Sequence, residues 1–331
     1  MQAIVWTDYG PPAGLQLREV ETPTPKENEV LIRVHATTVT AGDCEVRTLK
    51  FPFWLALPMR AYIGLRRPTR ITILGQELAG DVAAVGKDVT RFQVGDAVFG
   101  SPGFSMGAYA EYACVPAAGE DAVLARKPAN VTFAEAATLP VGALEALHFL
   151  RQAALQPGER LLINGAGGSI GTMAVQIAKA WGAHVTAVDS GAKLAMLRAV
   201  GADDVVDYTR EDFTARGDAY DVIFDIVGRS PFARSVKALK ANGRYLIANP
   251  KLGKMLRGWW TTKTSDKRVF FKVADYKAAD LEHIKELVEA GTLKPVIDRR
   301  YPLAATAEAH AYVDSGAKQG SVVIDVRDDR D

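Results

Sequence analysis

The sequence predicts an α/β protein in which a β domain is combined with a domain built on a doubly wound parallel sheet. A chain of 331 residues is long for a single hydrophobic core, so two domains are expected. The part of the chain up to about residue 125 is rich in short apolar runs separated by turn residues, which is typical of a β domain. Strand patterns then alternate with helix patterns, which indicates a parallel sheet covered by helices.

Two stretches of the N-terminal part show the β character most clearly. Residues 28–39, "NEVLIRVHATTV", are rich in Val, Ile and Thr and partly alternate, as a half-buried strand does. Residues 77–100 are divided by four glycines into short apolar runs. That spacing predicts tight connections between neighbouring strands.

The second part repeats a strand–helix unit. The strands are expected at 160–164, 184–189, 204–208, 220–228, 243–249 and 269–274, with helices at 172–181, 192–200 and 231–240 between them. In the tail we expect a helix at 279–291, a turn-rich segment at 295–303, another helix, and a strand at 321–326.

Composition excludes several classes of function. A net charge of +1 gives no electrostatic reason to expect a nucleic-acid partner. The most membrane-like stretch, residues 51–65, is too short to span a bilayer and is broken by Arg60, so no transmembrane segment is predicted. The N-terminus lacks the pattern of a signal peptide. Two cysteines, Cys44 and Cys114, do not make a disulfide framework, so a reducing cytoplasm is the simplest location.

The stretch "INGAGGSIGTMAV" follows the first strand of the alternating part and opens its first helix. Glycines let the backbone approach a pyrophosphate, and the helix N-terminus offers free N–H groups to it. Asp189 ends the next strand, where a carboxylate can accept hydrogen bonds from an adenine ribose. The plainer alternatives are turn glycines and a solvated strand end. The loop residues expected to contact a dinucleotide are Gly165, Ala166, Gly168, Ser169 and Ile170.

Several stretches, taken in order, resemble one enzyme family. They include "GQELAGDVAAVGKDVTRFQVGDAVFG", "AATLPVGALEALHFL", the glycine-loop segment and "LRAVGADDVVDYTRED". The chain is similar to the medium-chain dehydrogenase/reductase superfamily, in its zinc-independent quinone oxidoreductase-like branch. The resemblance implies a GroES-like domain of residues 1–124 and 273–331, a Rossmann domain of residues 125–272, and an active site in the cleft between them.

One position departs from the zinc-dependent members of that family. Their motif is Gly-His-Glu-x-x-Gly, in which the His binds zinc, whereas this chain has Gln76 after Gly75. An amide is a poor zinc ligand, Cys44 only lies near the place of another ligand, and the five histidines show no ligand spacing. We therefore expect no metal ion.

Without zinc to stabilise an alkoxide, a substrate should carry its own electron sink. Quinones and α,β-unsaturated carbonyl compounds do so, because negative charge collects on their oxygen as hydride arrives. The expected activity is therefore reduction of such compounds by NAD(P)H. The alternatives are a metal-free alcohol dehydrogenase and a non-catalytic dinucleotide-binding sensor or surface-binding protein.

The resemblance places three residues on the catalytic side. Thr40 could donate a hydrogen bond to a substrate oxygen, or it could be an ordinary β-branched strand residue. Asp43 is expected to belong to a structural turn or network rather than to donate a proton. Glu145 stands where relatives usually have Thr, and it could orient a water molecule or point to solvent.

The choice between NADH and NADPH is left open by the residues. Asp189 would repel a 2′-phosphate, whereas Ser190, Lys193 and Tyr208 resemble positions that hold NADP in relatives. Common use of NADPH in the branch favours NADPH slightly. The resemblance also places three more residues at the cofactor, namely Val227, Ala248 and Ser321.

Two stretches with aromatic and basic residues, 51–70 and 251–268, have no assigned role. They could cap the cleft over a bulky apolar substrate, contact a membrane surface or a single-stranded nucleic acid, or form a dimer contact or core-covering loop. The resemblance also implies a homo-oligomer, a dimer or tetramer, acting on a small hydrophobic carbonyl or quinone substrate.

Overall fold

The computed structural model describes residues 1–51, 53–119, 122–215, 217–271 and 274–327, apart from the side chains of residues 53–55. The chain folds into two compact units. Unit 1 comprises Met1–Val141, Asp275–Gly291 and Pro295–Asp331, and unit 2 comprises Gly142–Ala274 and Thr292–Lys294. The expected domain boundary at 124/125 stays a prediction, and the one at 272/273 lies outside the described residues.

Unit 1 is built on a mainly antiparallel sheet whose strands run in the order β14-β15-β3-β4-β5-β7, with β6 also paired to β3. A separate pair, β1 and β2, completes its strands. The bounds are β1 Gln2–Trp6, β2 Leu15–Glu19, β3 Glu29–Val39, β4 Leu78–Val85, β5 Ala97–Ser101, β6 Tyr112–Pro116, β7 Val123–Arg126, β14 Ile297–Pro302 and β15 Ser321–Asp325. The segments 28–39 and 77–100 form the expected strands because their apolar faces are buried in this sheet.

Short helices surround the sheet of unit 1. They are α1 Ala41–Thr48, α2 Phe53–Ile63, α3 Phe133–Ala136, α9 Ala278–Glu289 and α10 Thr306–Asp314, with 3-10 turns at Pro12–Gly14, Gly103–Ser105 and Leu303–Ala305. Helix α4, Pro140–Gln152, begins in unit 1 and continues in unit 2. In the described part of the chain, no helix has the length and apolar content needed to cross a membrane.

Unit 2 contains a parallel sheet with strand order β10-β9-β8-β11-β12-β13. Its strands are β8 Arg160–Asn164, β9 His184–Asp189, β10 Asp204–Asp207, β11 Tyr220–Asp225, β12 Leu239–Ile247 and β13 Arg268–Phe270. The expected α/β class with a doubly wound sheet is therefore confirmed. The final strand is shorter than the expected 269–274, of which residues 272 and 273 lie outside the described residues.

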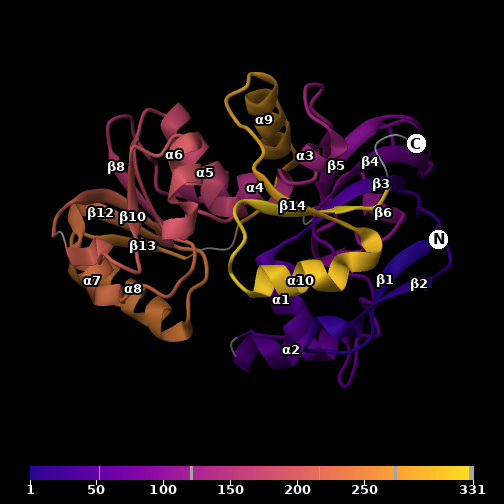
Figure 1. Cartoon of the computed structure of the whole chain (residues 1–331), viewed down its shortest axis with the longest axis horizontal. Coiled ribbons are helices and arrows are strands. Elements are labelled where there is room, and N and C mark those ends of the chain that lie inside the picture. Colours follow the sequence, from indigo (N-terminus) through magenta and orange to yellow (C-terminus); the bar gives the residue numbers. More distant parts are fainter. Residues whose placement is uncertain (52, 120–121, 216, 272–273, 328–331) are drawn as a thin grey trace. The chain divides into compact units, whose positions relative to one another are not determined.

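The helices of unit 2 cover both faces of this sheet. Helices α5 (Ser169–Ala180) and α6 (Leu194–Ala199) lie on one face, and α7 (Phe232–Lys237) and α8 (Leu252–Thr264) lie on the other (Figure 1). The chain leaves β8 in one direction to β9 and β10 and returns to continue on its other side with β11. The strand order therefore reverses between β8 and β11, which is where open α/β sheets bind their ligands, at the carboxyl ends of the strands.

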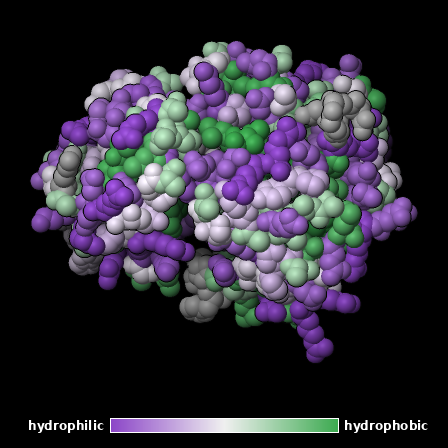
Figure 2. Space-filling model, viewed as in Figure 1, coloured by the Kyte–Doolittle hydropathy of each residue, from purple (hydrophilic) through white to green (hydrophobic). Residues whose placement is uncertain are grey.

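Residues 295–303 and 252–264 are among the segments that differ from expectation. The tail segment 295–303, expected as turn-rich, instead contains β14, so that expectation was wrong; β14 pairs in parallel with β15 and its hydrogen-bond partners are remote in sequence. Residues 252–264, for which no element was predicted, form α8. On the face of the molecule drawn in Figure 2, hydrophilic side chains are mixed with smaller hydrophobic groups.

Candidate functional site

The glycine loop of unit 2 follows β8 at the point where the strand order reverses. Gly165 has φ +86°, a conformation that glycine adopts without strain, and a Cβ there would lie 2.4 Å from Cγ2 of Val227. Val227, which follows β11, therefore packs directly over the loop. A Cβ at Gly171 would lie 2.4 Å from the carbonyl oxygen of Ala166, so only glycine lets α5 begin this close to the loop.

The loop fits the pyrophosphate of a dinucleotide. Gly168 is the N-cap residue of α5, no side chain caps this helix, and the space where a Cβ would stand at Gly168 is open. The first N–H groups of α5, at Ser169 and Ile170, have no carbonyl of their own helix to bond. An anion at this end would meet those N–H groups and the positive end of the helix dipole.

Asp189 braces the loop from the neighbouring strand. Its Oδ2 accepts a hydrogen bond from the backbone N–H of Gly167 at 2.8 Å, and its Oδ1 accepts one from the N–H of Ser190 at 2.8 Å. The ammonium of Lys193 lies 3.2 Å from the same carboxylate, and both side chains are buried. The carboxylate that was expected to accept from a ribose is therefore turned toward the loop.

The other predicted cofactor residues of unit 2 border the same edge of the sheet. Tyr208 follows β10 with its side chain 59% exposed, and its N–H donates to the carbonyl of Asp189 at 3.2 Å. Ala248 follows β12 and donates its N–H to the carbonyl of Asp225 at 3.2 Å. The structure thus brings the predicted loop, Asp189, Ser190, Lys193, Tyr208, Val227 and Ala248 together at the carboxyl ends of adjacent strands.

Glu145 belongs to unit 2 and lies on α4. A Cβ at Gly142, one turn earlier, would lie 3.0 Å from the carbonyl oxygen of Ser169, so α4 passes close to the start of α5. The side chain of Glu145 is half-buried and makes polar interactions of its own. A place of Glu145 at the cofactor and a catalytic role for it both stay predictions.

In unit 1, Thr40 and Asp43 form a capping box at the start of α1. Oγ1 of Thr40 accepts from the N–H of Asp43 at 3.0 Å, and Oδ2 of Asp43 accepts from the N–H of Thr40 at 2.9 Å. The hydroxyl of Thr40 also donates to the same carboxylate oxygen at 2.7 Å. The pair therefore fixes where β3 ends and α1 begins, and both side chains are buried.

A second buried carboxyl group, that of Glu77, lies at the same end of the sheet. It accepts hydrogen bonds from the hydroxyl of Thr38 and from the N–H of Val141, the latter at 2.7 Å. The sequence reasoning missed this residue, although it directly follows Gln76 in the stretch singled out for its missing histidine. The available signal in the sequence was an acidic residue directly before the apolar residues of β4.

Burial shifts the acid–base properties of both groups. It raises the pKa of Asp43 to about 6, against the opposing effect of the Thr40 hydrogen bonds. It raises the pKa of Glu77 to about 7, and the nearby charge of Asp43 adds to that effect. Unit 1 therefore holds two carboxyl groups that titrate near neutral pH, which is unusual away from functional sites.

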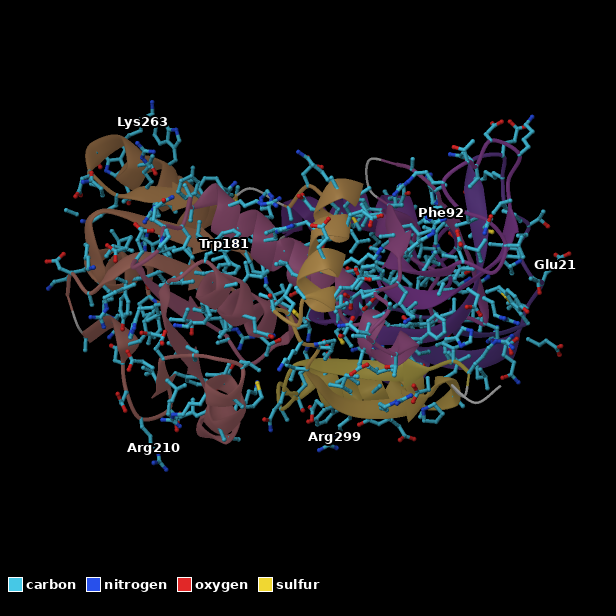
Figure 3. The ribbon with its side chains drawn as sticks, turned by 90° about the horizontal axis from the view of Figure 1, so that it is seen from above. Glu21, Phe92, Trp181, Arg210, Lys263 and Arg299 are labelled. Atoms are coloured by element: carbon cyan, nitrogen blue, oxygen red, sulfur yellow. The ribbon has the colours of Figure 1, made fainter. Side chains whose placement is uncertain are left out.

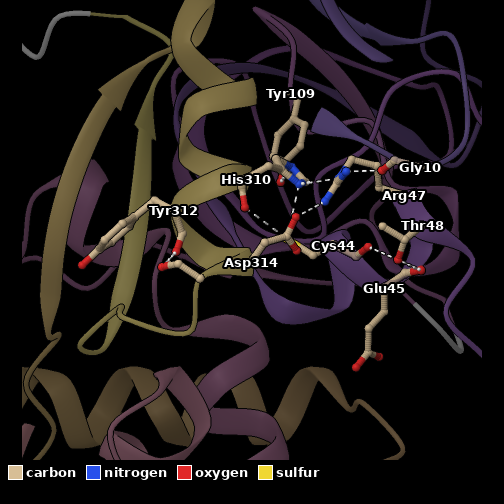
Figure 4. Close-up of polar contacts among 10 residues, drawn as sticks. Gly10, Cys44, Glu45, Arg47, Thr48, Tyr109, His310, Tyr312 and Asp314 are labelled. Atoms are coloured by element: carbon tan, nitrogen blue, oxygen red, sulfur yellow. Dashed lines mark hydrogen bonds and ion pairs between the residues drawn. The ribbon is translucent and has the colours of Figure 1, made fainter. Parts of the chain in front are cut away.

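A chain of hydrogen bonds leads from Asp43 to a buried arginine, and Figure 4 shows its part from Tyr109 through His310 to Arg47. Nε of Arg47 donates to Nδ1 of His310 at 3.2 Å, and Nε2 of His310 then donates to the hydroxyl of Tyr109 at 3.1 Å. Because Arg47 can only donate, it sets the tautomer of His310. The Tyr109 hydroxyl lies against the carboxyl of Asp43 and lowers its pKa.

In this chain of hydrogen bonds, His310 is neutral and Arg47, at its end, is charged. Burial and the Arg47 charge lower the pKa of His310 to about 3. Arg47 also donates to the carbonyl of Gly10 and pairs with Asp314. The thiol of Cys44 lies 3.3 Å from Nδ1 of His310, and burial raises its pKa to about 12, so it is not a thiolate near neutral pH.

Gln76 lies beside the first turn of α1. A Cβ at Gly42 would lie 2.8 Å from its Nε2, so the amide fills the space next to that helix. Among the described residues, no group of three or more His, Cys, Asp or Glu side chains could hold a metal ion. Whether the protein works without a metal stays a prediction from the residue types.

Ser321, the last of the predicted cofactor residues, belongs to unit 1. It directly precedes Val322, which is paired with Val39 in the sheet, so Ser321 lies at the strand end where Thr40 begins the turn into α1. The side chain of Ser321 is buried. Ser321, Thr40, Asp43 and Glu77 are thus gathered at one end of the unit 1 sheet.

Known proteins resemble the chain over nearly its whole length. The family model for the alcohol dehydrogenase GroES-like domain matches residues 26–127, and the model for a zinc-binding dehydrogenase matches residues 200–324. The 2-methylene-furan-3-one reductase of Solanum lycopersicum is 32% identical over 98% of this chain and 79% of its own length. The chloroplastic NADPH-dependent alkenal/one oxidoreductase of Arabidopsis thaliana is 32% identical over the same shares.

A solved structure agrees with these sequence relatives. The quinone oxidoreductase from Coxiella burnetii superposes with a TM-score of 0.87 at 30% identity, over 99% of this chain and 99% of that one. The matching GroES-like region, residues 26–127, includes Thr40, Asp43 and Glu77. The chain belongs to the medium-chain dehydrogenase/reductase superfamily, in its quinone oxidoreductase-like branch.

Proposed function

We propose that this protein is an NAD(P)H-dependent oxidoreductase that transfers hydride to quinones or α,β-unsaturated carbonyl compounds without a metal ion. The observation that carries the proposal is the glycine loop that Asp189 holds in place where the strand order of unit 2 reverses. The chain that contains it matches enone and quinone reductases over nearly its whole length. We further propose that residues 1–124 and 273–331 form the substrate domain and residues 125–272 the cofactor domain.

A nicotinamide cofactor would be held by the residues at the carboxyl edge of unit 2. The N-terminus of α5, with Gly168, Ser169 and Ile170, would bind the pyrophosphate of the cofactor. Gly165 and Ala166 would let the backbone of the loop approach that pyrophosphate. When bound, its reduced form supplies the hydride. We assign Val227, Ala248 and Ser321 to the rest of the cofactor on the strength of the resemblance.

Thr40 and Asp43 can move a proton toward a substrate oxygen. In the structure the Thr40 hydroxyl donates to Oδ2 of Asp43 at 2.7 Å, so its hydrogen is engaged while the acid is charged. When Asp43 gains a proton, that proton can bridge Oδ2 and Oγ1 and release the Thr40 hydrogen for a substrate oxygen that becomes negative. Burial, which raises the pKa of Asp43 to about 6, makes the protonated form accessible near neutral pH.

NADPH is the proposed cofactor. The charge of Asp189 is offset by Lys193 and by two backbone N–H groups, so it opposes a 2′-phosphate less than a free carboxylate would. Ser190, Lys193 and Tyr208 lie at the same edge. Dissociation constants measured for both cofactors by fluorescence titration test this assignment, and tighter binding of NADH would contradict it.

The activity is tested by following cofactor oxidation with a panel of quinones, enones and enals. We expect turnover with at least one class. Tight cofactor binding without turnover across the panel would favour a dinucleotide-binding sensor, whereas alcohol oxidation at high pH in the presence of a chelator would favour an alcohol dehydrogenase. Elemental analysis is expected to find no stoichiometric zinc, and activity that disappears on chelation would refute the metal-free mechanism.

The setting of the protein is also proposed from residue types and resemblance. Two buried or partly buried free thiols, Cys44 and Cys114, suit a cytoplasmic location. A homo-oligomer, a dimer or tetramer, is proposed by resemblance alone. Light scattering on the purified chain measures the mass in solution.

A further inference from the structure

Helix α8 of unit 2 has its large apolar side chains on the outside. Leu252, Leu256, Trp259 and Trp260 are 48%, 64%, 57% and 63% exposed. Their spacing of four, three and one residues puts them on one side of the helix, within about a third of its circumference. A surface helix of a soluble protein normally places such residues toward the core.

The side of the same helix that contacts β13 carries Gly258 and Thr262. A Cβ at Gly258 would lie 2.8 Å from Cγ1 of Val269, so the helix backbone rests directly on β13. The hydroxyl of Thr262 accepts a hydrogen bond from the N–H of Val269 at 3.0 Å. The outward direction of the apolar side is therefore fixed by the packing of the other side and is not a matter of helix rotation.

Lys254 fixes the first turn of α8 to the carboxyl edge of the sheet. Its ammonium donates to the carbonyl oxygens of Gly228 and Ser230 at 2.8 and 2.7 Å, and it lies 3.6 Å from the carboxylate of Asp225. The helix is thus anchored at its start and along its inner side, while nothing in the described chain covers its outer side.

The sequence around this helix is rich in basic residues. Residues 226–265 contain nine Lys and Arg residues and no Asp or Glu, although the whole chain carries a net charge of only +1. Five of these cations are exposed and have no acidic partner among the described residues, namely Arg229, Lys237, Lys251, Arg257 and Lys263. Lys263 points away from the fold at the end of α8 (Figure 3).

An apolar side flanked by unpaired cations fits one kind of partner best. A second copy of this chain would bring the same cations to a symmetric contact, where they would repel one another. A nucleic acid would match the charge, but it offers no apolar layer for Leu252 and Leu256. An anionic bilayer matches both, because tryptophan and leucine enter the headgroup boundary while lysine and arginine meet the phosphates.

We propose that α8 docks the protein on an anionic lipid surface, with the helix lying in the plane of the interface. Leu252, Leu256, Trp259 and Trp260 enter the boundary of the acyl chains, and Arg229, Lys251, Arg257 and Lys263 contact lipid phosphates. The contact is peripheral and reversible, since one helix side and a few cations give modest affinity.

The test is flotation of the purified full chain with vesicles made of equal parts phosphatidylcholine and phosphatidylglycerol, and with vesicles of phosphatidylcholine alone. We expect binding to the anionic vesicles only, weakened by added salt. W259S/W260S should bind roughly ten-fold more weakly, because its apolar contact is lost, whereas the matched control Phe104→Ser, at another exposed aromatic residue, should bind like the wild type.

Charge reversal tests the second half of the proposal. R257E/K263E should lose roughly five-fold or more in affinity per cation, and Arg18→Glu on β2 should not. Unchanged melting temperatures show that the variants are folded. Failure of the wild type to float with anionic vesicles, or equal flotation of W259S/W260S, refutes the proposal.

Other partners for the outer side of α8 would give different experimental results. If W259S/W260S lowers the mass measured by light scattering and the wild type does not float, α8 covers a second copy and the lipid proposal is wrong. If the wild type binds a single-stranded oligonucleotide through the two tryptophans but not the vesicles, the partner is a nucleic acid and the proposal is equally wrong. None of these measurements depends on enzyme turnover.

Discussion

Buried carboxyl groups in the two units differ in what balances their charge. In unit 2, Asp189 accepts two backbone N–H groups and pairs with Lys193. In unit 1, Asp43 and Glu77 accept hydrogen bonds from threonines and backbone N–H groups, and neither makes an ion pair in the described chain. Burial raises the pKa of Glu77, and the charge of Lys318 opposes this only in part. The interactions of Asp189 hold the glycine loop in place. The surroundings of Asp43 and Glu77 make the protons of these two carboxyl groups harder to remove.

The comparison teaches that similar residues at strand ends serve different purposes according to their partners. A carboxylate with a cation and two N–H donors is a structural brace that keeps the glycine loop in shape for a pyrophosphate. A carboxyl group buried without a cation keeps its proton to higher pH, so it is suited to hold and pass on a proton.

The largest effect is expected when the buried cation of unit 1 is removed. Arg47→Met should lower the free energy of unfolding by about 3–5 kcal/mol, because the Gly10 carbonyl and His310 lose their donor and Asp314 loses its partner. Urea denaturation measures the change. Arg126→Met, which breaks an exposed pair with Asp96, should cost less than about 1 kcal/mol. A similar cost for both would show that the network in unit 1 is energetically unimportant.

Glu77→Gln should remove a pH dependence of stability. The pKa of Glu77 is raised from 4.5 to about 7, so between these values the folded state keeps a proton that the unfolded state releases. Stability therefore falls as pH rises through this window, by about 3 kcal/mol in total, and the loss is fully present above pH 7. Unfolding measured at several pH values should show a shallower slope in the variant. Glu27→Gln, an exposed control, should keep the wild-type slope.

Asp189→Asn distinguishes a loop brace from a ribose ligand. We expect both NADH and NADPH to bind about ten-fold more weakly, because the amide cannot accept from both Gly167 and Ser190. Asp207→Asn, at the register partner on β10, should leave both dissociation constants nearly unchanged. Weaker NADH binding together with stronger NADPH binding would show instead that the carboxylate selects the cofactor by charge.

The smallest effect compares two capping boxes of the same type. Thr40 and Asp43 form one in the buried cluster of unit 1, and Thr132 and Glu135 form another at an exposed helix start. Replacing either threonine by alanine should cost about 1 kcal/mol in thermal unfolding. Thr40→Ala should also raise the pKa of Asp43 further, because the Thr40 hydrogen bonds lower it. Identical pH profiles for the two variants would argue against a special role of the buried box.

Much of unit 2 could be predicted from the sequence because its signals are local. The glycine loop, the helix after it and Asp189 lie within one β–α–β segment, and the strand at 184–189 was expected with the bounds that the structure has. Thr40 and Asp43 were found only by resemblance. Glu77 was passed over beside Gln76, since an isolated acid in a sequence does not reveal that it will be buried without a cation.

By itself, then, the sequence determined the alternation of strands and helices, the glycine loop and the family, because each depends on neighbours along the chain. Tertiary structure decided which way Asp189 turns, that Arg47 reaches His310 across more than two hundred residues, and that α8 rests on β13 by its glycine and threonine side. It also decided that the segment 295–303 contains a strand, because β14 exists only where β15 is available to pair with it. Charge balance and exposure depend on residues brought together by folding, and no local pattern contains them.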